Sequence, residues 1–273
     1  MQANLQVALS GALPALLAMW FVDRLDHKRP EPPSLRRMVT FVGMLSVIPA
    51  ILIENFLSNG PGTSLDSQIT YQGATFSAFV VAAAVEEACK IAVIYWIVWR
   101  RPEFDERLDG IVYASRAGLG FALVENVGYL LGQTSLSGQL SVWIARALLA
   151  VPGHAMWSGM IGYTAARRRF DKKGLGLLGG YLLAVAFHGA YDAAVFYQQP
   201  LHYEGHGDLA KLMLLVPVAL TVIAFLVVRA MAKNALTLDD AEAATNAAKA
   251  AAQQAQQYSQ VPPGAGSPPS QTF

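Results

Sequence analysis

Acidic side chains and histidines lie inside apolar stretches of this sequence, where charge is costly. Residues 79–99 read FVVAAAVEEACKIAVIYWIVW and carry Glu86, Glu87 and Lys90 near their middle. A charge at the centre of a membrane-spanning helix costs about 2.5–3.5 kcal/mol on insertion scales. Such residues usually face the interior of a helix bundle, pair with one another and mark a functional site.

The next three apolar stretches carry groups of the same kind. They are Arg116, Glu125 and Asn126, then Arg146 and His154, then His188 and Asp192. When depth is counted along each expected helix at 1.5 Å per residue, the acids and histidines fall in one layer, from the bilayer mid-plane into its outer half. The sequence therefore predicts one polar pocket shared by four helices.

Helical spacing predicts two side-chain pairs in this pocket. His188 and Asp192 are four residues apart, so they share a helix face and can form a hydrogen bond. A carboxylate behind an imidazole fixes its tautomer and raises its basicity, which suits both metal ligation and proton transfer. Glu86 and Lys90 have the same spacing.

The two adjacent glutamates should point in different directions, because neighbouring residues are about 100° apart around a helix. We expect one of Glu86 and Glu87 to face the pocket and the other to pair with Lys90 or Arg116. Arg116 and Arg146 are expected to be structural counter-charges and not reacting groups.

The helices that must position these groups follow from composition. The 273 residues are 54% hydrophobic and only 14% charged, with a mean hydropathy of +0.36, which is too apolar for a typical soluble domain. About 20 apolar residues are needed to span a bilayer. Seven segments qualify: 5–22, 38–58, 75–99, 110–132, 140–165, 174–198 and 209–231. The predicted fold class is an all-α, polytopic membrane bundle of about seven helices.

Basic residues predict the orientation of this bundle. Fifteen of the twenty lysines and arginines fall in alternate loops on one side. The positive-inside rule then places the N-terminus outside and the C-terminus in the cytoplasm of a multi-pass cell-membrane protein. We interpret the basic clusters as topology signals, so no nucleic-acid partner is expected.

Two regions are predicted along the chain. Residues 1–233 form the membrane bundle, with its motifs between 86 and 192. Residues 234–273 are Ala/Gln-rich and then Pro/Gly-rich, and we expect a disordered cytoplasmic tail in which the Ala/Gln part can form a fraying helix.

The motifs occur in a defined order: Glu86-Glu87-x-x-Lys90, Phe121-x-x-x-Glu125-Asn126, Arg146 before Pro-Gly-His154, and His188-x-x-x-Asp192. This ordered set resembles the PrsW family of intramembrane proteases, within a larger group that includes the CAAX prenyl proteases. The resemblance covers roughly residues 35–200. The Glu-Asn pair looks like PrsW, whereas the CAAX proteases usually carry His there, which argues against prenylated substrates.

The resemblance implies hydrolysis of a membrane protein or peptide within or near the bilayer. PrsW-like proteins are associated with cleavage of membrane-anchored anti-sigma factors in bacteria. Peptide hydrolysis needs an activated water, a stabilised oxyanion and a proton for the leaving amine. We expect Glu86 or Glu87 to activate the water.

The remaining groups have expected roles beside that base. Glu125, His154 and His188 would bind a metal or hold the water and the oxyanion directly. Asp192 would orient His188, and Asn126 could donate to the oxyanion. Two histidines and a glutamate form a known zinc set, but the chain has no H-E-x-x-H motif. Zinc and a metal-free glutamate mechanism therefore both stay open.

Two other classes of function use the same residues. Intramembrane acids and histidines also build the proton relays of transporters. Against a transporter, the halves of the chain show no inverted repeat, and the ionisable residues form one cluster. A non-catalytic membrane scaffold, in which these groups only join helices, is the other alternative.

Overall fold

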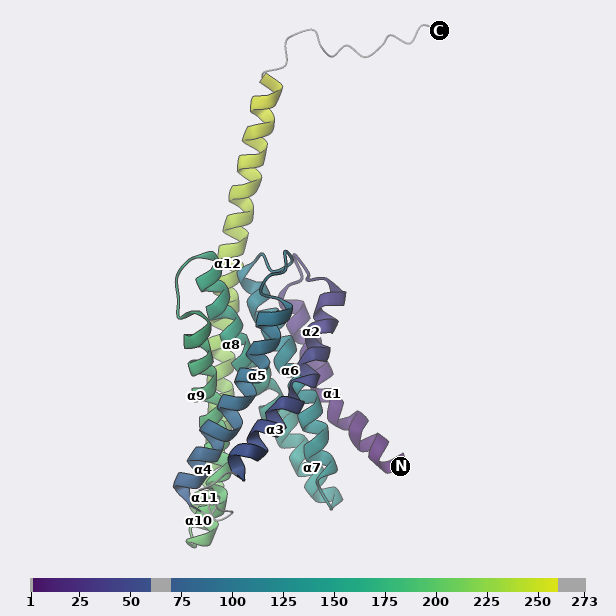
Figure 1. Ribbon diagram of the computed structural model, residues 1–273, viewed down its shortest axis with the longest axis vertical. Helices are drawn as coiled ribbons and strands as arrows, with labels where there is room; N and C mark the ends of the chain where they lie inside the picture. Colours follow the sequence, from purple (N-terminus) through teal and green to yellow (C-terminus); the bar gives the residue numbers. More distant parts are fainter. Residues whose placement is uncertain (1, 60–69, 260–273) are drawn as a thin grey trace.

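The computed structural model describes residues 2–59 and 70–259, which are helical through most of their length and contain no strand (Figure 1). The helices lie side by side in a bundle, and one of them extends far beyond it. The elements are α1 (Gln2–Leu25), α2 (Pro33–Leu45), α3 (Val47–Ser58), α4 (Tyr71–Phe76), the π-helix η2 (Ser77–Ala84), α5 (Val85–Ile97), α6 (Arg107–Leu131), α7 (Leu136–Ala145), the π-helix η3 (Arg146–Ala150), α8 (Val151–Phe170), α9 (Gly176–Phe196), α10 (Gln198–Tyr203), α11 (Gly207–Met213) and α12 (Leu215–Ser259).

The all-α class is confirmed for the described residues, and each predicted apolar segment falls on helical chain. Three helical stretches are long and apolar enough to cross a membrane: Leu5–Leu25, Pro33–Ser58 and Gly207–Gln257. The number of seven crossings and the orientation of the bundle remain predictions.

Helix α6 forms the centre of the bundle and packs against α1, α2 and α8. Glycine permits the closest approach. A Cβ atom built on Gly162 of α8 would lie 1.8 Å from the carbonyl oxygen of Gly110 in α6, so a larger residue would force the helices apart. Small residues have this role at many membrane helix interfaces. The close contact fixes α6 against α8, and both helices carry predicted site residues.

Two π-helical stretches lie directly before predicted site residues. The stretch η2 ends two residues before Glu86, and η3 ends at Ala150, four residues before His154. A π-helix inserts residues into the regular hydrogen-bond pattern and is frequent at functional sites. The hydroxyl of Tyr181 donates to the Ala84 carbonyl at the end of η2, 2.8 Å away. Both stretches therefore change the direction in which the following side chains point.

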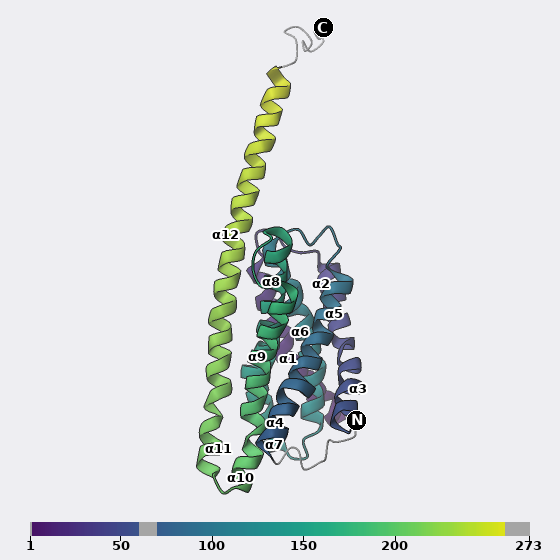
Figure 2. The same cartoon turned by 60° about the vertical axis from the view of Figure 1, so that its left-hand side comes forward.

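Helix α12 runs without a break through the boundary predicted at residue 233 and continues to Ser259, along the bundle and past its end (Figure 2). The buried Asp239 carboxylate explains why the helix stays attached there. It accepts the backbone N–H groups of Arg107 and Leu108 at the start of α6, at 3.0 and 3.1 Å, and the Arg107 guanidinium at 2.9 Å. Helix starts leave such N–H groups unpaired and attract negative charge. Residues 260–273 of the predicted tail lie outside the described part of the chain.

The substitution Asp239→Ala tests this attachment. It removes the acceptor for two buried N–H groups, and we expect the free energy of unfolding to fall by about 2–4 kcal/mol. Chemical or thermal unfolding in detergent, followed by circular dichroism, measures the change. Asp240→Ala is the matched control, because Asp240 forms only surface ion pairs with Lys28 and Arg29 and should matter less. Equal, small effects of both variants would contradict the assignment.

Candidate active site

Four neighbouring parts of the bundle bring all nine predicted site residues into one cluster. Helix α5 supplies Glu86, Glu87 and Lys90, α6 supplies Glu125 and Asn126, η3 and α8 supply Arg146 and His154, and α9 supplies His188 and Asp192. The shared pocket inferred from helix depth is therefore present. The catalytic roles of these residues are a separate matter and stay predictions.

Lys90 lies at the centre of the cluster with only 1% of its surface exposed. Its ammonium donates to Glu86 Oε2 at 3.0 Å, to Glu87 Oε1 at 2.9 Å and to His154 Nδ1 at 2.7 Å. The expectation that only one glutamate would take a cation was wrong. The two glutamates lie three and four residues before Lys90, and both positions neighbour it on a helix surface.

Arg116, the other cation considered for these glutamates, lies elsewhere. Its guanidinium donates to Asp23 Oδ2 of α1 at 3.0 Å, and Arg36 of α2 binds the same carboxylate oxygen at 2.7 Å. Arg116 is therefore a structural counter-charge, as expected, but for a different acid. It joins α1 and α2 to α6.

His154 connects Lys90 to a second acid. Because the Lys90 ammonium can only donate, Nδ1 of His154 must accept, and the imidazole proton is on Nε2. That nitrogen lies 2.8 Å from Glu125 Oε2, which also accepts from Arg146 Nη2 at 2.8 Å. The contacts thus run without interruption from Lys90 through His154 and Glu125 to Arg146.

His188 is held between two carboxylates and an indole ring. Its Nδ1 lies 3.0 Å from Glu87 Oε1, and its Nε2 lies 3.3 Å from Asp192 Oδ2. The Trp157 ring stacks on the imidazole at 4.2 Å between centroids. The pair predicted from the spacing of His188 and Asp192 is confirmed, and these contacts leave the ring little freedom to turn.

Asn126 was expected to donate to an oxyanion, but its side chain is hydrogen-bonded within the helix bundle. Its amide group donates to the Gly11 carbonyl of α1 at 2.6 Å and accepts from Arg146 Nε at 2.9 Å. The side chain therefore joins α1 to α6 and holds Arg146 beside Glu125. Donation from Asn126 to an oxyanion gains no support from this geometry.

The charges of the cluster do not balance by themselves. Its carboxylates are Glu86, Glu87, Glu125 and Asp192, and its permanent cations are Lys90 and Arg146. With both histidines neutral, two negative charges are left over in a cluster whose carboxylate side chains are at most 18% exposed. Buried charge without a partner is strongly unfavourable. One divalent metal ion, or two protons, would restore the balance.

The donor atoms also suit a metal ion, provided that the ion displaces the Lys90 ammonium from Nδ1 of His154. One ligand atom each of Glu86, His154 and His188 lies within 4.8 Å of the other two, and all three residues are buried. Two histidines and a glutamate are a ligand set of catalytic zinc. This set differs from the predicted one by a single residue, since Glu86 replaces Glu125, whose carboxylate binds Arg146 and His154 Nε2.

A polar cavity of about 530 Å³ leads to the cluster and is lined by Glu86, Glu125, Tyr129 and residues of α3 and η2. Glu54 of α3 also lines it, and its buried Oε1 has no hydrogen-bond partner among the described residues. Glu54 is not among the site residues predicted from the sequence. The available signal was that Glu54 is the only ionisable residue in the segment 38–58.

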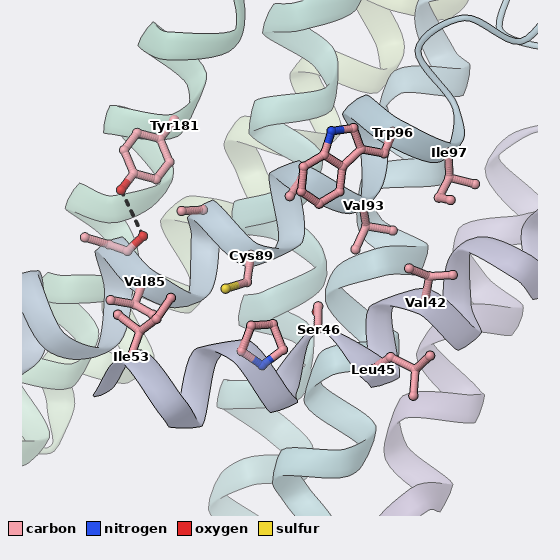
Figure 3. Close-up of a pocket in the computed structure, with 14 residues that line it drawn as sticks. Val42, Leu45, Ser46, Ile53, Val85, Cys89, Val93, Trp96, Ile97 and Tyr181 are labelled. Carbon is pink, nitrogen blue, oxygen red and sulfur yellow. Dashed lines mark hydrogen bonds between the residues drawn. The ribbon is translucent and has the colours of Figure 1, made fainter. Parts of the chain in front are cut away.

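An apolar groove of about 600 Å³ lies on the other side of α3, between that helix and α5 (Figure 3). Val85, Cys89 and Trp96 line it on α5, and Tyr181 lines it on α9. Val85 directly precedes Glu86, so the groove passes next to the cluster. Helix α3 buries only Val47 and Ala50, and it separates the groove from the polar cavity with few contacts.

Comparison with known proteins shows which family the chain resembles. The family model described as PrsW family intramembrane metalloprotease matches residues 31–232. The chain is 32% identical over 185 residues to Protease PrsW of Geobacillus kaustophilus, covering 67% of this chain and 76% of the relative. It is 30% identical over 195 residues to Protease PrsW of Clostridioides difficile, covering 69% and 79%. No solved structure matches the chain.

Replacing Lys90 by methionine tests the balance of charge. The substitution keeps the length of the side chain but leaves buried carboxylates without their cation, so we expect a loss of about 3–5 kcal/mol in the free energy of unfolding. Denaturant titration in detergent measures it. Lys211→Met, at a lysine side chain 77% exposed, is the control and should be neutral.

A second substitution separates charge from packing. Adding Glu87→Gln to Lys90→Met removes one of the unpaired charges, so the double variant should regain part of the lost stability. A Lys90→Met protein as stable as the wild type would show that Lys90 does not balance these acids.

Proposed function

Because the chain belongs to the PrsW family of intramembrane metalloproteases, we propose that its buried cluster hydrolyses peptide bonds of membrane-anchored proteins. The observation that carries this proposal is the position of Glu86. Its carboxylate lines the polar cavity, and its Oε2 lies 3.9 Å from a ring nitrogen of both His154 and His188. A carboxylate, two imidazoles and access for water are what hydrolysis requires.

Glu86 is the proposed proton acceptor for the attacking water. Of the adjacent glutamates it alone lines the cavity, whereas Glu87 is fully buried and contacts Lys90, His188 and Ser158. Glu87 therefore acts as a positioning residue, holding His188 and Lys90 in place. The proposal thus chooses Glu86 as the base, whereas helical spacing alone did not distinguish Glu86 from Glu87.

His188 is the proposed donor of the proton to the leaving amine. Its Nε2 lies 3.9 Å from Glu86 Oε2 and 3.3 Å from Asp192 Oδ2, so it can receive the proton that Glu86 removes from water. Asp192 and Glu87 hold the ring in the orientation needed for this transfer. One residue then takes the proton and a neighbour returns it to the cleaved bond.

Glu86, His154 and His188 would also hold the metal ion that the family description implies, most simply zinc. A bound ion supplies a Lewis acid for the substrate carbonyl and for water. If Glu86 were a ligand of that ion, Glu125, which also lines the cavity, would be the carboxylate left to accept a proton from the water.

The substrate is proposed to be a membrane-anchored protein, with regulators of the anti-sigma-factor type as the class that the resemblance implies. Its membrane segment would lie in the apolar groove beside α5, which is lined by aliphatic and aromatic side chains. Entry from the lipid would displace α3, because that helix stands between the groove and the cavity. A substrate helix would have to unwind there to bring a peptide bond to Glu86.

Cleavage of a panel of single-span membrane peptides in liposomes tests the activity. We expect the wild type to cleave and Glu86→Gln, Glu87→Gln and His154→Ala to lose about 100-fold or more of kcat/KM. A strong zinc chelator should abolish cleavage if the donor set needs its metal, with metal content measured in parallel.

The matched control for these variants is Glu204→Gln, which changes an exposed glutamate that contacts only Tyr71 among the described residues. Full cleavage by folded Glu86→Gln would exclude the proposed base. Cleavage that survives the chelator in metal-free protein would favour the glutamate mechanism. If no protein cleaves any peptide while proton flux is observed, a transporter is the better description.

Cys89, the only cysteine of the chain, reports on the groove. Variants of a cleaved peptide, each with one cysteine at a different position of its membrane span, are mixed with the Glu86→Gln protein, which should not cleave them. An oxidant is then added so that neighbouring cysteines form disulfides. We expect disulfides to Cys89 from a few neighbouring positions of the span, and none with Cys89→Ser. A peptide that is cleaved by the wild type yet never cross-links from any position would contradict binding in this groove.

A further inference from the structure

A second buried acidic group lies at the end of the bundle where α12 leaves it. Asp26 and Glu31 belong to the connection between α1 and α2, and Asp109 belongs to the first turn of α6. One carboxylate oxygen of each lies within 4.8 Å of the other two. On α6, Asp109 comes sixteen residues before Glu125, about 24 Å at 1.5 Å per residue, so this group is separate from the proposed active site.

Contacts with the backbone and one tyrosine fix the positions of the three acids. Asp109 Oδ2 accepts the N–H groups of Asp105 at 3.0 Å and Glu106 at 2.7 Å, which caps the start of α6. Asp26 Oδ2 accepts the N–H of Glu31 at 3.2 Å, and the Tyr113 hydroxyl donates to Glu31 Oε2. The carboxylates therefore converge without being able to turn away from one another.

No basic side chain neutralises this group. The exposed fractions of Asp26, Glu31 and Asp109 are 3%, 6% and 0%, and none of them forms an ion pair with a lysine or arginine in the described parts of the chain. The nearby Arg29 and Arg107 bind other acids.

One oxygen in this group lacks an N–H donor. Asp109 Oδ1 is buried and accepts from no N–H group of the described residues, and the neighbour of the Asp109 carboxyl group there is the carboxyl group of Glu31. A fully buried carboxylate oxygen without a donor is unfavourable by itself. Its presence within a group of three acids indicates that something positive belongs there.

Repulsion among the three buried carboxylates points the same way. Carboxylates that share a buried site cannot all stay ionised unless a cation balances them.

We propose that Asp26, Glu31 and Asp109 bind one hard divalent cation, Mg²⁺ or Ca²⁺, with water completing its coordination. The donors are all carboxylate oxygens, which these ions prefer, and no histidine or cysteine belongs to the set. By binding acids of both segments, the ion links the connection between α1 and α2 to the first turn of α6. Because Asp239 of α12 caps the same turn, the ion stabilises the end of the bundle to which α12 is attached.

Thermal unfolding and equilibrium dialysis of the full chain in detergent test this site. After treatment with EDTA, added Mg²⁺ or Ca²⁺ should bind at one ion per chain and raise Tm by about 5 °C or more at saturation. Glu31→Gln and, independently, Asp26→Asn should abolish both effects. Glu86→Gln should keep them, which separates this site from the cluster at His154.

The ion-free proteins provide a second readout. Without the ion, Glu31→Gln removes repulsion among the acids, so its Tm should equal or exceed that of the stripped wild type. With the ion, the order should reverse. The absence of bound ion and of any Tm response in the wild type would overturn the proposal, and so would an undiminished response in both variants.

Discussion

Buried carboxylates require positive charge beside them, and the Lys90 ammonium provides it at the centre of the cluster. It holds Glu86, Glu87 and His154 within 3.0 Å. Through His154 it also fixes the proton that is shared with Glu125. Removal of water makes each of these contacts stronger and each missing partner more costly. The geometry of the proposed active site therefore depends on this one cation and on the helix that carries it.

Helix α6 connects two buried acidic groups with different chemistry. Toward its C-terminal end, Glu125 contacts His154, which belongs with Glu86 and His188 to a set that suits a metal of the zinc type. At its first turn, Asp109 joins a set of oxygens alone, which suits Mg²⁺ or Ca²⁺. Between them, glycines bring α6 into close contact with α8.

In the proposed function, the substrate reaches the site past helix α3. This helix buries two residues only and separates the apolar groove from the polar cavity at Glu86. Glu86 lines the cavity and the preceding Val85 lines the groove, directly after the π-helix η2. A membrane-anchored substrate needs an apolar surface to bind to, and hydrolysis of its peptide bond needs a cavity that water can enter. Helix α3 lies between the groove and the cavity that would serve these two purposes. Local opening is expected where few contacts hold an element.

The sequence by itself determined the helices, the common depth of the polar groups and the pairs within one helix. His188 with Asp192 and Glu86 with Lys90 were predictable because spacing along a helix is a local property. Contacts between helices depend on how each one is rotated and packed, and only the tertiary structure decided them. It turned both adjacent glutamates to Lys90, paired the Asn126 amide with the Gly11 carbonyl, and brought a ligand atom of Glu86 within 4.8 Å of those of His154 and His188. The tertiary structure also brought Asp26 and Glu31, from the connection between α1 and α2, next to Asp109 of α6. No local sequence pattern could predict this group, because residues 26 and 109 are far apart in the sequence.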